Sequence, residues 1–269
     1  MKYKLLLPLA LFILLISCKG KKSEWSAAYK KLLTRSEMNL KGNVKSIRDN
    51  TYKVDSLFGQ LRKLSKDVTG NEYFEFDTAG RKLKGAVYTP DDIASSRSEA
   101  NINEQGNKED NFYTGDQSTT TERNIYLCLD NGVIIEKDIL RPEKESKLTM
   151  TGKEISNYDE KGNLISIDVY GFKDLSYKQN IKTDGKGNIL EDETRSDKGD
   201  NLLGKKIFKY DENGNPIEAD ESSPVDNTHT HWTFKYEFDT HGNWIKKYTT
   251  MINMPLVENT LTERTIVYY

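Results

Sequence analysis

The feature that most constrains this chain is a five-residue turn pattern that recurs along it. The pattern, Asp-x-x-Gly followed by Asn or Arg, begins at Asp67, Asp77, Asp159, Asp184, Asp211 and Asp239. Its glycines are Gly70, Gly80, Gly162, Gly187, Gly214 and Gly242. An Asp at the first position of a type I turn accepts hydrogen bonds from nearby backbone N–H groups, and a Gly at the fourth takes a positive φ at little cost. Because such a turn with a Gly bulge closes a β-hairpin, the pattern predicts a series of hairpins.

The spacing of the turns predicts how the hairpins follow one another. The last four repeat glycines, Gly162, Gly187, Gly214 and Gly242, follow one another at nearly even intervals. A unit of roughly 27 residues holds two strands and two turns, so the repeat predicts a long antiparallel β-meander. Asp67 precedes Asp77 by much less than one such unit, and we therefore expect it to mark the return turn at the opposite end of that unit.

The repeats resemble a known family. Tyr158-Asp159-Glu160-Lys161-Gly162-Asn163-Leu164-Ile165 and Tyr210-Asp211-Glu212-Asn213-Gly214-Asn215-Pro216-Ile217 resemble YD repeats, the units of Rhs and teneurin shells, and residues 236–245 are a close variant. The chain as a whole resembles the YD-repeat lipoproteins of bacterial cell envelopes, well over residues 150–250 and less closely over 40–140. Large members of the family spiral into a shell around another polypeptide. This chain has only about eight units and no attached toxin-like domain. The resemblance therefore implies an all-β meander that forms a curled single sheet or an open barrel.

The N-terminus carries a secretion signal. Lys2 and Lys4 precede a short apolar run, Leu5–Ile16, which is broken only by Pro8. A helix that spans a bilayer needs roughly 20 apolar residues, and this run is too short for that. The run is therefore typical of a cleaved signal peptide, which we assign to residues 1–17.

The end of this signal resembles a lipobox. In bacterial lipoproteins, the thiol of the cysteine in a sequence like Leu15-Ile16-Ser17-Cys18 is joined to diacylglycerol, and the chain is cut just before it. The resemblance implies lipidation of Cys18 and stable anchoring to a membrane. An ordinary signal peptide with an incidental cysteine is the alternative. Residues 18–23 form a basic tether, and by analogy with lipoprotein sorting in other bacteria, Lys19 favours the outer membrane with the protein facing the periplasm.

The rest of the chain, residues 24–269, is expected to be one YD-repeat β domain. Trp25, Ala28, Tyr29, Leu32 and Leu33 recur at helical spacing and predict a short N-terminal helix over residues 24–35. Residues 90–124 interrupt the repeats. Their apolar residues are only Ile93, Ala94, Ala100, Ile102, Phe112 and Tyr113. We expect this stretch to be a long polar excursion or a poorly ordered hairpin.

Charge and cysteine content exclude some functions. The chain has 40 Lys and Arg against 42 Asp and Glu, a net charge of −2, so no overall basic field attracts nucleic acid. If Cys18 is lipidated, Cys128 is the one remaining thiol, and no intramolecular disulfide forms. Cys128 lies in an apolar run with strand character, where a small buried side chain is expected.

No catalytic or cofactor motif is present. The sequence lacks His-Glu-x-x-His, Gly-x-Ser-x-Gly, the phosphate-binding Gly-x-x-x-x-Gly-Lys-Ser/Thr and a Gly-x-Gly-x-x-Gly that opens a helix, so we expect neither an enzyme nor a bound cofactor. Glycosidase-like carboxylate pairs occur at Glu191 and Asp192 and at Glu218 and Asp220. With 42 acidic residues, such pairs are inevitable.

Two groups of residues would suit a metal ion, but each has a simpler explanation, and no metal site is expected. His229 and His231 would share one face of a strand near His241, an arrangement that suits a transition metal, but three surface histidines explain the pattern equally. The acidic turn residues would suit calcium, yet the turn itself explains each of them. These residues are Asp159, Asp184, Asp211 and Asp239.

The aromatic residues also allow two interpretations. The chain has 15 Tyr and 3 Trp, and from Trp232 to Phe238 aromatics alternate with polar residues, the period of a strand with one buried face. Aromatics beside a repeated turn are typical of core packing. An exposed aromatic strip instead binds sugar rings. The candidates for such a glycan platform are Trp232, Tyr236, Trp244 and Tyr248.

These observations predict a lipid-anchored envelope protein whose sheet is a protein-binding or scaffolding surface. The alternative is a glycan-binding module of the envelope, and a carbohydrate-active enzyme comes third. The arrangement of side chains separates them: a strip of exposed aromatics favours glycan binding, a large apolar patch favours a protein partner, and a deep pocket with two facing carboxylates favours an enzyme.

Overall fold

The computed structural model describes residues 38–57, 60–104, 107–128, 134–143, 147–160, 162–171, 174–197, 201–252 and 259–269. The described residues form 17 strands joined by turns and contain no helix. None of them belongs to an apolar helix of membrane-spanning length. The predicted signal peptide (1–17), the tether (18–23) with Cys18 and the helix predicted over residues 24–35 lie outside the described residues.

The strands follow one another with short connections. They are β1 (Val44–Leu57), β2 (Gln60–Lys66), β3 (Glu72–Phe76), β4 (Lys82–Tyr88), β5 (Ala94–Ile102), β6 (Lys108–Thr114), β7 (Thr120–Cys128), β8 (Ile134–Pro142), β9 (Leu148–Tyr158), β10 (Leu164–Gly171), β11 (Asp174–Thr183), β12 (Ile189–Ser196), β13 (Leu202–Tyr210), β14 (Pro216–Ser223), β15 (Thr228–Phe238), β16 (Trp244–Ile252) and β17 (Asn259–Tyr268).

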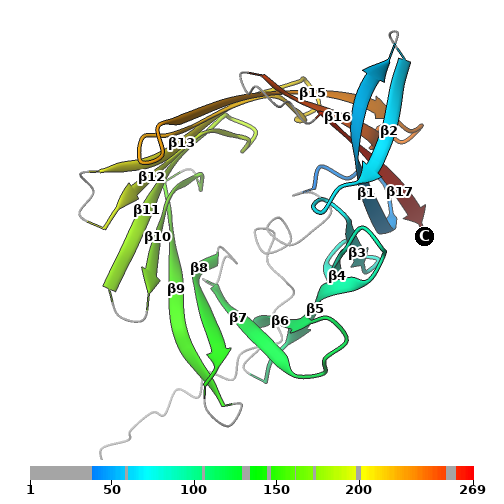
Figure 1. The fold of residues 1–269 in the computed structure, drawn as a ribbon. Helices are drawn as coiled ribbons and strands as arrows, with labels where there is room; N and C mark the ends of the chain where they lie inside the picture. Colours follow the sequence, from blue (N-terminus) through cyan, green and yellow to red (C-terminus); the bar gives the residue numbers. More distant parts are fainter. Residues whose placement is uncertain are drawn as a thin grey trace, which may run out of the picture.

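The sheet closes on itself. From β3 to β17, each strand pairs antiparallel with the next. The first strand then completes the ring, because β1 pairs with β17 from Val44↔Tyr268 to Val54↔Asn259 and with β3 through Ile47↔Phe74. Figure 1 shows the strands in sequence order around this ring. The expectation of a curled single sheet or an open barrel is therefore wrong: the fold is a closed antiparallel barrel.

The barrel closes for a physical reason that the repeat sequences do not encode. An open sheet leaves a row of unpaired N–H and C=O groups on each edge strand, and pairing the two edges satisfies both rows at once. The turn pattern specifies only local hairpins. It carries no information about the partner of β1, which lies at the other end of the described chain, at Arg264 and its neighbours.

Residues 90–124 also differ from the expectation. They do not form an excursion but contribute β5, β6 and the first part of β7 to the wall. Their polar side chains satisfy one another: Lys108 Nζ donates to Asp110 Oδ2 at 2.7 Å with both residues buried, and Arg123 Nε donates to Asn111 Oδ1 at 2.7 Å. Buried polar groups that are paired in this way allow a strand with few apolar residues.

The turn at Asp159 shows the repeated geometry. Gly162 N donates to Asp159 O at 3.0 Å, and Asn163 N donates to Asp159 Oδ1 at 2.8 Å. Gly162 has a φ of 81°, in the left-handed region that favours glycine. The turns at Asp77, Asp184, Asp211 and Asp239 have the same Gly N to Asp O bond and likewise connect paired strands.

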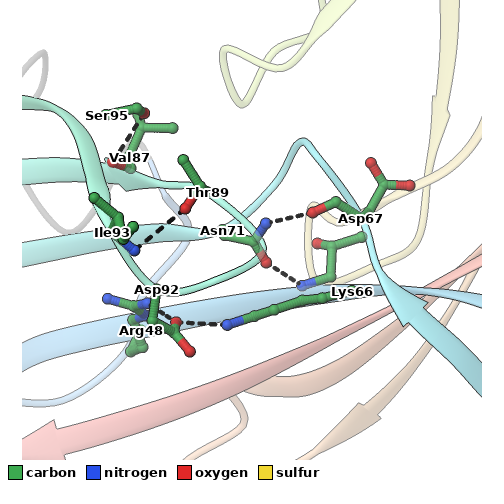
Figure 2. A network of polar contacts seen from close by, with 10 residues as sticks. Arg48, Lys66, Asp67, Asn71, Val87, Thr89, Asp92, Ile93 and Ser95 are labelled. Carbon is green, nitrogen blue, oxygen red and sulfur yellow. Dashed lines mark hydrogen bonds and ion pairs between the residues drawn. The ribbon is translucent and has the colours of Figure 1, made fainter. Parts of the chain in front are cut away.

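The Asp67 turn is different. It lies at the opposite end of β3 from Asp77, as expected, but it closes no hairpin, because β2 and β3 both pair with β1. Figure 2 shows Asn71 beside Asp67, and Asn71 Nδ2 donates to Asp67 O at 2.7 Å. In the same network, Asp92 lies between Arg48 and Lys66 and binds both, at 2.7 and 2.5 Å.

The two faces of the barrel wall can be assigned. Leu40, which precedes β1, packs in a buried cluster with Val44, Ile47 and Phe76. Figure 1 draws the blue chain before β1 on the inner side of the ring, so Ile47 belongs to the inner face. Residues at odd positions along β1, such as Asp49 and Thr51, share that face because successive side chains of a strand alternate.

Candidate ligand-binding site on the inner face

A row of aromatic side chains lies on the inner face of β13 to β16. Directly paired residues share a face of a sheet, and the pairs Tyr236↔Lys247, Lys247↔Thr262 and Thr262↔Thr51 connect Tyr236 to the inner face of β1. The same reasoning through Phe208↔Ala219 and Ala219↔Trp232 extends this face to β13. The row consists of Phe208, Tyr210, Trp232, Phe234, Tyr236, Phe238 and Trp244.

Part of this row surrounds a hollow of about 290 Å³. Its aromatic lining is Phe208, Trp232 and Phe234, with Ala219 between them. Polar groups stand at its edge, among them Thr249 and the ion pair of Lys206 Nζ with Glu221 Oε1 at 3.1 Å. Aromatic faces with a few polar groups around them can stack on an apolar ring face and hydrogen-bond to its substituents.

The remaining aromatics pack against each other. The ring centroids of Tyr236 and Trp244 are 6.2 Å apart, and those of Tyr236 and Phe238 are 6.0 Å apart. The Tyr236 hydroxyl donates to Pro216 O at 2.7 Å, and burial raises the pKa of Tyr236. Tyr236 and Trp244 therefore support the wall next to the hollow, with the Tyr236 hydroxyl already engaged.

A buried charge cluster adjoins Trp244 at the seam of the barrel. Arg264 Nε and Nη2 donate to the two carboxylate oxygens of Asp49 at 2.8 and 2.7 Å, and the Arg264 guanidinium lies 3.4 Å from the centre of the Trp244 ring. Burial lowers the pKa of Lys247, and burial, together with the nearby Asp49 carboxylate, raises the pKa of Glu72. The ion pair joins β1 to β17 and so connects the two ends of the described chain.

The four candidate residues for glycan binding do not all lie on the same face of the sheet. The structure brings Trp232, Tyr236 and Trp244 to the inner face but places Tyr248 on the outer face, where its hydroxyl donates to Glu237 Oε1 at 2.6 Å. The outer face is charged. Its cross-strand ion pairs include Lys182–Glu191 at 2.7 Å, Lys209–Glu218 at 2.5 Å and Lys246–Glu237 at 2.9 Å.

The histidines are not gathered either. His229 and His231 lie near the start of β15 and face Asp220, at 3.5 and 2.9 Å. His241 lies beyond the other end of β15 and stacks on Tyr268, with ring centroids 4.1 Å apart. Within the described residues, no three His, Cys, Asp or Glu side chains form a group that could hold a metal ion.

The carboxylates singled out in the sequence have separate partners. Glu191 faces outward and binds Lys182, whereas its neighbour Asp192 lies on the inner face, where burial raises its pKa. Glu218 and Asp220 share the outer face, but Glu218 binds Lys209 and Asp220 binds His231. The carboxylates of the repeat turns accept backbone N–H groups, as Asp184 does from Lys186 and Asn188.

Sequence reasoning missed most of the residues that line the hollow. Phe208, Phe234 and Lys206 were not among the candidates, although Phe234 continues the alternation between Trp232 and Tyr236. That alternation was the available signal for Phe234. Phe208 and Lys206 come from a different hairpin, and only the pairing of β13 with β14 and of β14 with β15 brings them to Trp232.

Comparison with known proteins identifies a similar fold. No family model and no curated protein matches the chain. It is similar to the solved structure of a porin-like protein from Bacteroides uniformis, with a TM-score of 0.55 and 10% identity over 83% of this chain and 96% of that one. A porin-like protein from Bacteroides vulgatus has a TM-score of 0.43 and 11% identity over 84% of this chain and 98% of that one. The TcdB2-TccC3 structure without its hypervariable C-terminal region has a TM-score of 0.28 and 14% identity over 78% of this chain and 15% of that one. The likeness to the Bacteroides uniformis protein shows a shared barrel fold.

Proposed function

We propose that this chain is a lipid-anchored cell-envelope protein whose barrel stands in water and binds a glycan on its inner face. The lipobox resemblance supports lipidation at Cys18, and the recurrent turns support membership of the YD-repeat envelope lipoproteins. By analogy with lipoprotein sorting in other bacteria, Lys19 supports anchoring to the outer membrane with the protein facing the periplasm. We propose a binding role without catalysis.

The outer face supports a barrel surrounded by water. A barrel that spans a membrane presents an apolar band to lipid, and Lys or Arg at the bilayer midplane costs about 2–4 kcal/mol each. Here the outer face carries ion pairs such as Lys209–Glu218 and Lys246–Glu237. Half-exposed ion pairs of this kind are stable in water and costly in hydrocarbon.

The observation that carries the glycan proposal is the hollow lined by Phe208, Trp232 and Phe234, with the Lys206–Glu221 pair at its edge. Its aromatics lie side by side on one face and are only partly buried. Aromatics that bind a ligand keep part of their surface exposed in this way, whereas the aromatics of a closed core are fully buried. The neutral hydroxyls of a sugar are suited to the Lys, Glu and Thr groups around it.

The test is a binding measurement on the full chain in detergent against a panel of envelope oligosaccharides, by calorimetry. We expect Trp232→Ala and Phe234→Ala to weaken binding of the oligosaccharide that the wild type binds by at least tenfold. The circular dichroism spectrum of each variant should stay that of a β-protein. Tyr248→Ala on the outer face is the matched control and should bind like the wild type. Unchanged binding in Trp232→Ala would refute the proposed site.

A protein-binding or scaffolding role is the second candidate function. One observation favours it: the barrel end near the Asp239 turn already binds the segment of chain that precedes β1, because Lys41 N donates to Asn243 Oδ1 at 2.6 Å. The apolar residues exposed on the outside are scattered over many strands, as Ile207 and Ile252 are. They therefore offer less support for this role than that contact does.

A further inference from the structure

Two cations beside the aromatic row have hydrogen-bond donors that the described chain does not use. Within the described residues, Lys247 Nζ has no hydrogen-bond acceptor and no ion-pair partner. Arg264 binds Asp49 through Nε and Nη2, but its third nitrogen, Nη1, is buried without an acceptor. Both cations lie near the Trp244 ring, with Arg264 Cζ 3.4 Å and Lys247 Nζ 5.6 Å from its centre. This cluster therefore lacks hydrogen-bond acceptors.

The fold alone does not account for the charge of Lys247. Burial lowers its pKa, and of the neighbouring charges Asp49 raises it while Arg264 lowers it. A cation that is withdrawn from water without a bonded partner is unfavourable for the folded state. The next residue shows the usual arrangement of a lysine in this wall, because Lys246 lies on the outer face and binds Glu237 at 2.9 Å. Perturbed charges without a partner are typical of ligand sites.

Glu72 is near this cluster but does not satisfy its donors. It shares the inner face with Phe74, two residues further along β3. Within the described chain, Glu72 forms no ion pair with Lys247 or Arg264. Burial and the Asp49 carboxylate raise the pKa of Glu72, whereas the two cations lower it. Glu72 therefore lies close enough to repel an anionic ligand while leaving the donors of Lys247 free to bind one.

The cluster continues the hollow along β16. Thr249 lines the hollow, and Lys247 lies two residues before it on the same strand and the same face. Successive residues of an antiparallel strand rise about 3.4 Å, so the two positions are roughly 7 Å apart. The neighbouring strand keeps the same order, because Phe234 pairs with Thr249 and Tyr236 pairs with Lys247. An oligosaccharide with one ring in the hollow therefore places its next ring beside Lys247.

We propose that the glycan of the inner face is acidic: the sugar next to the one in the hollow carries a carboxylate, and Lys247 Nζ donates hydrogen bonds to it. Carboxylate oxygens only accept hydrogen bonds, so they suit donors that lack acceptors, and a bond between two charged groups is stronger than one to a neutral hydroxyl. The inference rests on the proposed glycan site and names the class of sugar that this site selects.

The test compares two probes by calorimetry on the full chain in detergent: a trisaccharide of galacturonic acid and its methyl ester. The ester keeps the rings and hydroxyls and removes the negative charges. At neutral pH and low salt, we expect the acid to bind at least tenfold more tightly than the ester. This preference should decrease as salt is added, because salt screens the attraction between charges.

Three variants locate the source of the preference. Lys247→Met removes the cation at similar volume, and the ratio of acid to ester affinity should fall to about one. Glu72→Gln removes a nearby negative charge, and the ratio should rise above that of the wild type. Lys246→Met, one residue away on the outer face, is the matched control and should keep the wild-type ratio. Damage to the fold would weaken the binding of both probes alike, so opposite shifts of the ratio in Lys247→Met and Glu72→Gln identify a charge effect.

The outcomes separate this inference from the glycan proposal. Equal affinity for acid and ester, an unchanged ratio in Lys247→Met, or binding of neutral oligosaccharides alone would overturn the acidic class and leave the glycan site in place. A chain that binds neither these probes nor any oligosaccharide of the envelope panel would overturn the glycan site itself and this inference with it.

Discussion

At the scale of single residues, the inner face depends on a few buried charges with well-formed partners. Arg264 and Asp49 are both buried and share two hydrogen bonds across the β1–β17 seam. The same Arg264 covers Trp244 and thereby connects the seam to the aromatic row. A buried charge that loses its partner is costly, whereas an exposed pair contributes little.

The buried seam pair should contribute more to stability than the exposed ion pairs of the wall. Arg264→Met removes the guanidinium and leaves the Asp49 carboxylate buried without its partner, so we expect the free energy of unfolding to fall by about 3–5 kcal/mol. Chemical denaturation of the full chain measures it. Lys182→Met, which breaks the exposed pair with Glu191, is the control and should change stability by less than about 1 kcal/mol. Similar losses in both variants would contradict this account.

Two glutamates should respond to pH with opposite signs. Burial raises the pKa of Glu72, so the folded state loses stability as pH rises from the unfolded value of about 4.3 through the raised one, and Glu72→Gln should gain stability relative to the wild type over that window. Hydrogen bonds from Tyr248 and Lys246 lower the pKa of Glu237. Its contribution is present above that unfolded value and lost as pH falls, so Glu237→Gln should lose relative stability at neutral pH. Denaturation between pH 3 and 8 tests both variants, and equal signs would contradict the assignment.

The sequence predicted part of the candidate site, and a single bulge explains one failure. Strict alternation places Trp244 and Tyr248 on the same face because an even number of positions separates them. The pairing shifts between Glu237↔Lys246 and Phe238↔Trp244, so one extra residue of β16 lies between the two pairs. Trp244 therefore faces inward with Phe238, and Tyr248 faces outward. A bulge of this kind has no clear signal in the sequence.

At the scale of elements, the sequence predicts the structures that depend on contacts between nearby residues and misses those that depend on residues far apart in the chain. The hairpins of residues 150–250 were predictable because Asp, Gly and Asn act within a single turn, as at Asp211 and Asn215. The strands of residues 90–124 were not predictable from apolar content. Their stability depends on partners from successive strands, such as Asp110 and Tyr126. The closure of β1 on β17 was the hardest feature to predict from the sequence, since it depends on the longest-range pairing of the described chain.

The repeat glycines should differ in how much they tolerate a side chain. Gly162 has a φ of 81° and no atom within 4 Å of an added Cβ, so Gly162→Ala should cost about 1 kcal/mol for the left-handed backbone alone. At Gly70, with a φ of 73°, the added Cβ would lie 2.5 Å from Thr51 Oγ1, so Gly70→Ala should cost a further amount of about 1–3 kcal/mol. Gly185→Ala, at a position with open space and no positive φ, is the control and should be nearly neutral. Denaturant unfolding of the three variants tests this order.

At the scale of the whole molecule, closure decides what kind of surface the repeats produce. An open meander would present its aromatic row to solvent on a broad sheet and leave β1 and β17 as exposed edges. In the closed barrel, the aromatic row lines the inside and the ion pairs cover the outside, so the proposed glycan site lies on the inner face. Within the described strands, β2 is the one that pairs with a single neighbour, β1.

Hydrogen exchange should reveal this closure directly. If β1 and β17 pair along Ile47–Lys53, neither strand is a free edge along this seam, and exchange of the amides bonded across it should be as slow as in β15 and β16. Residues 60–65 of β2 pair with β1 alone and should exchange faster. Mass spectrometry of the full chain after exchange resolves these peptides. Arg264→Met should raise exchange in β1 and β17 before the other strands, because it weakens the seam. Exchange in β1 and β17 as fast as in β2 of the wild type would mean that the sheet is open in solution.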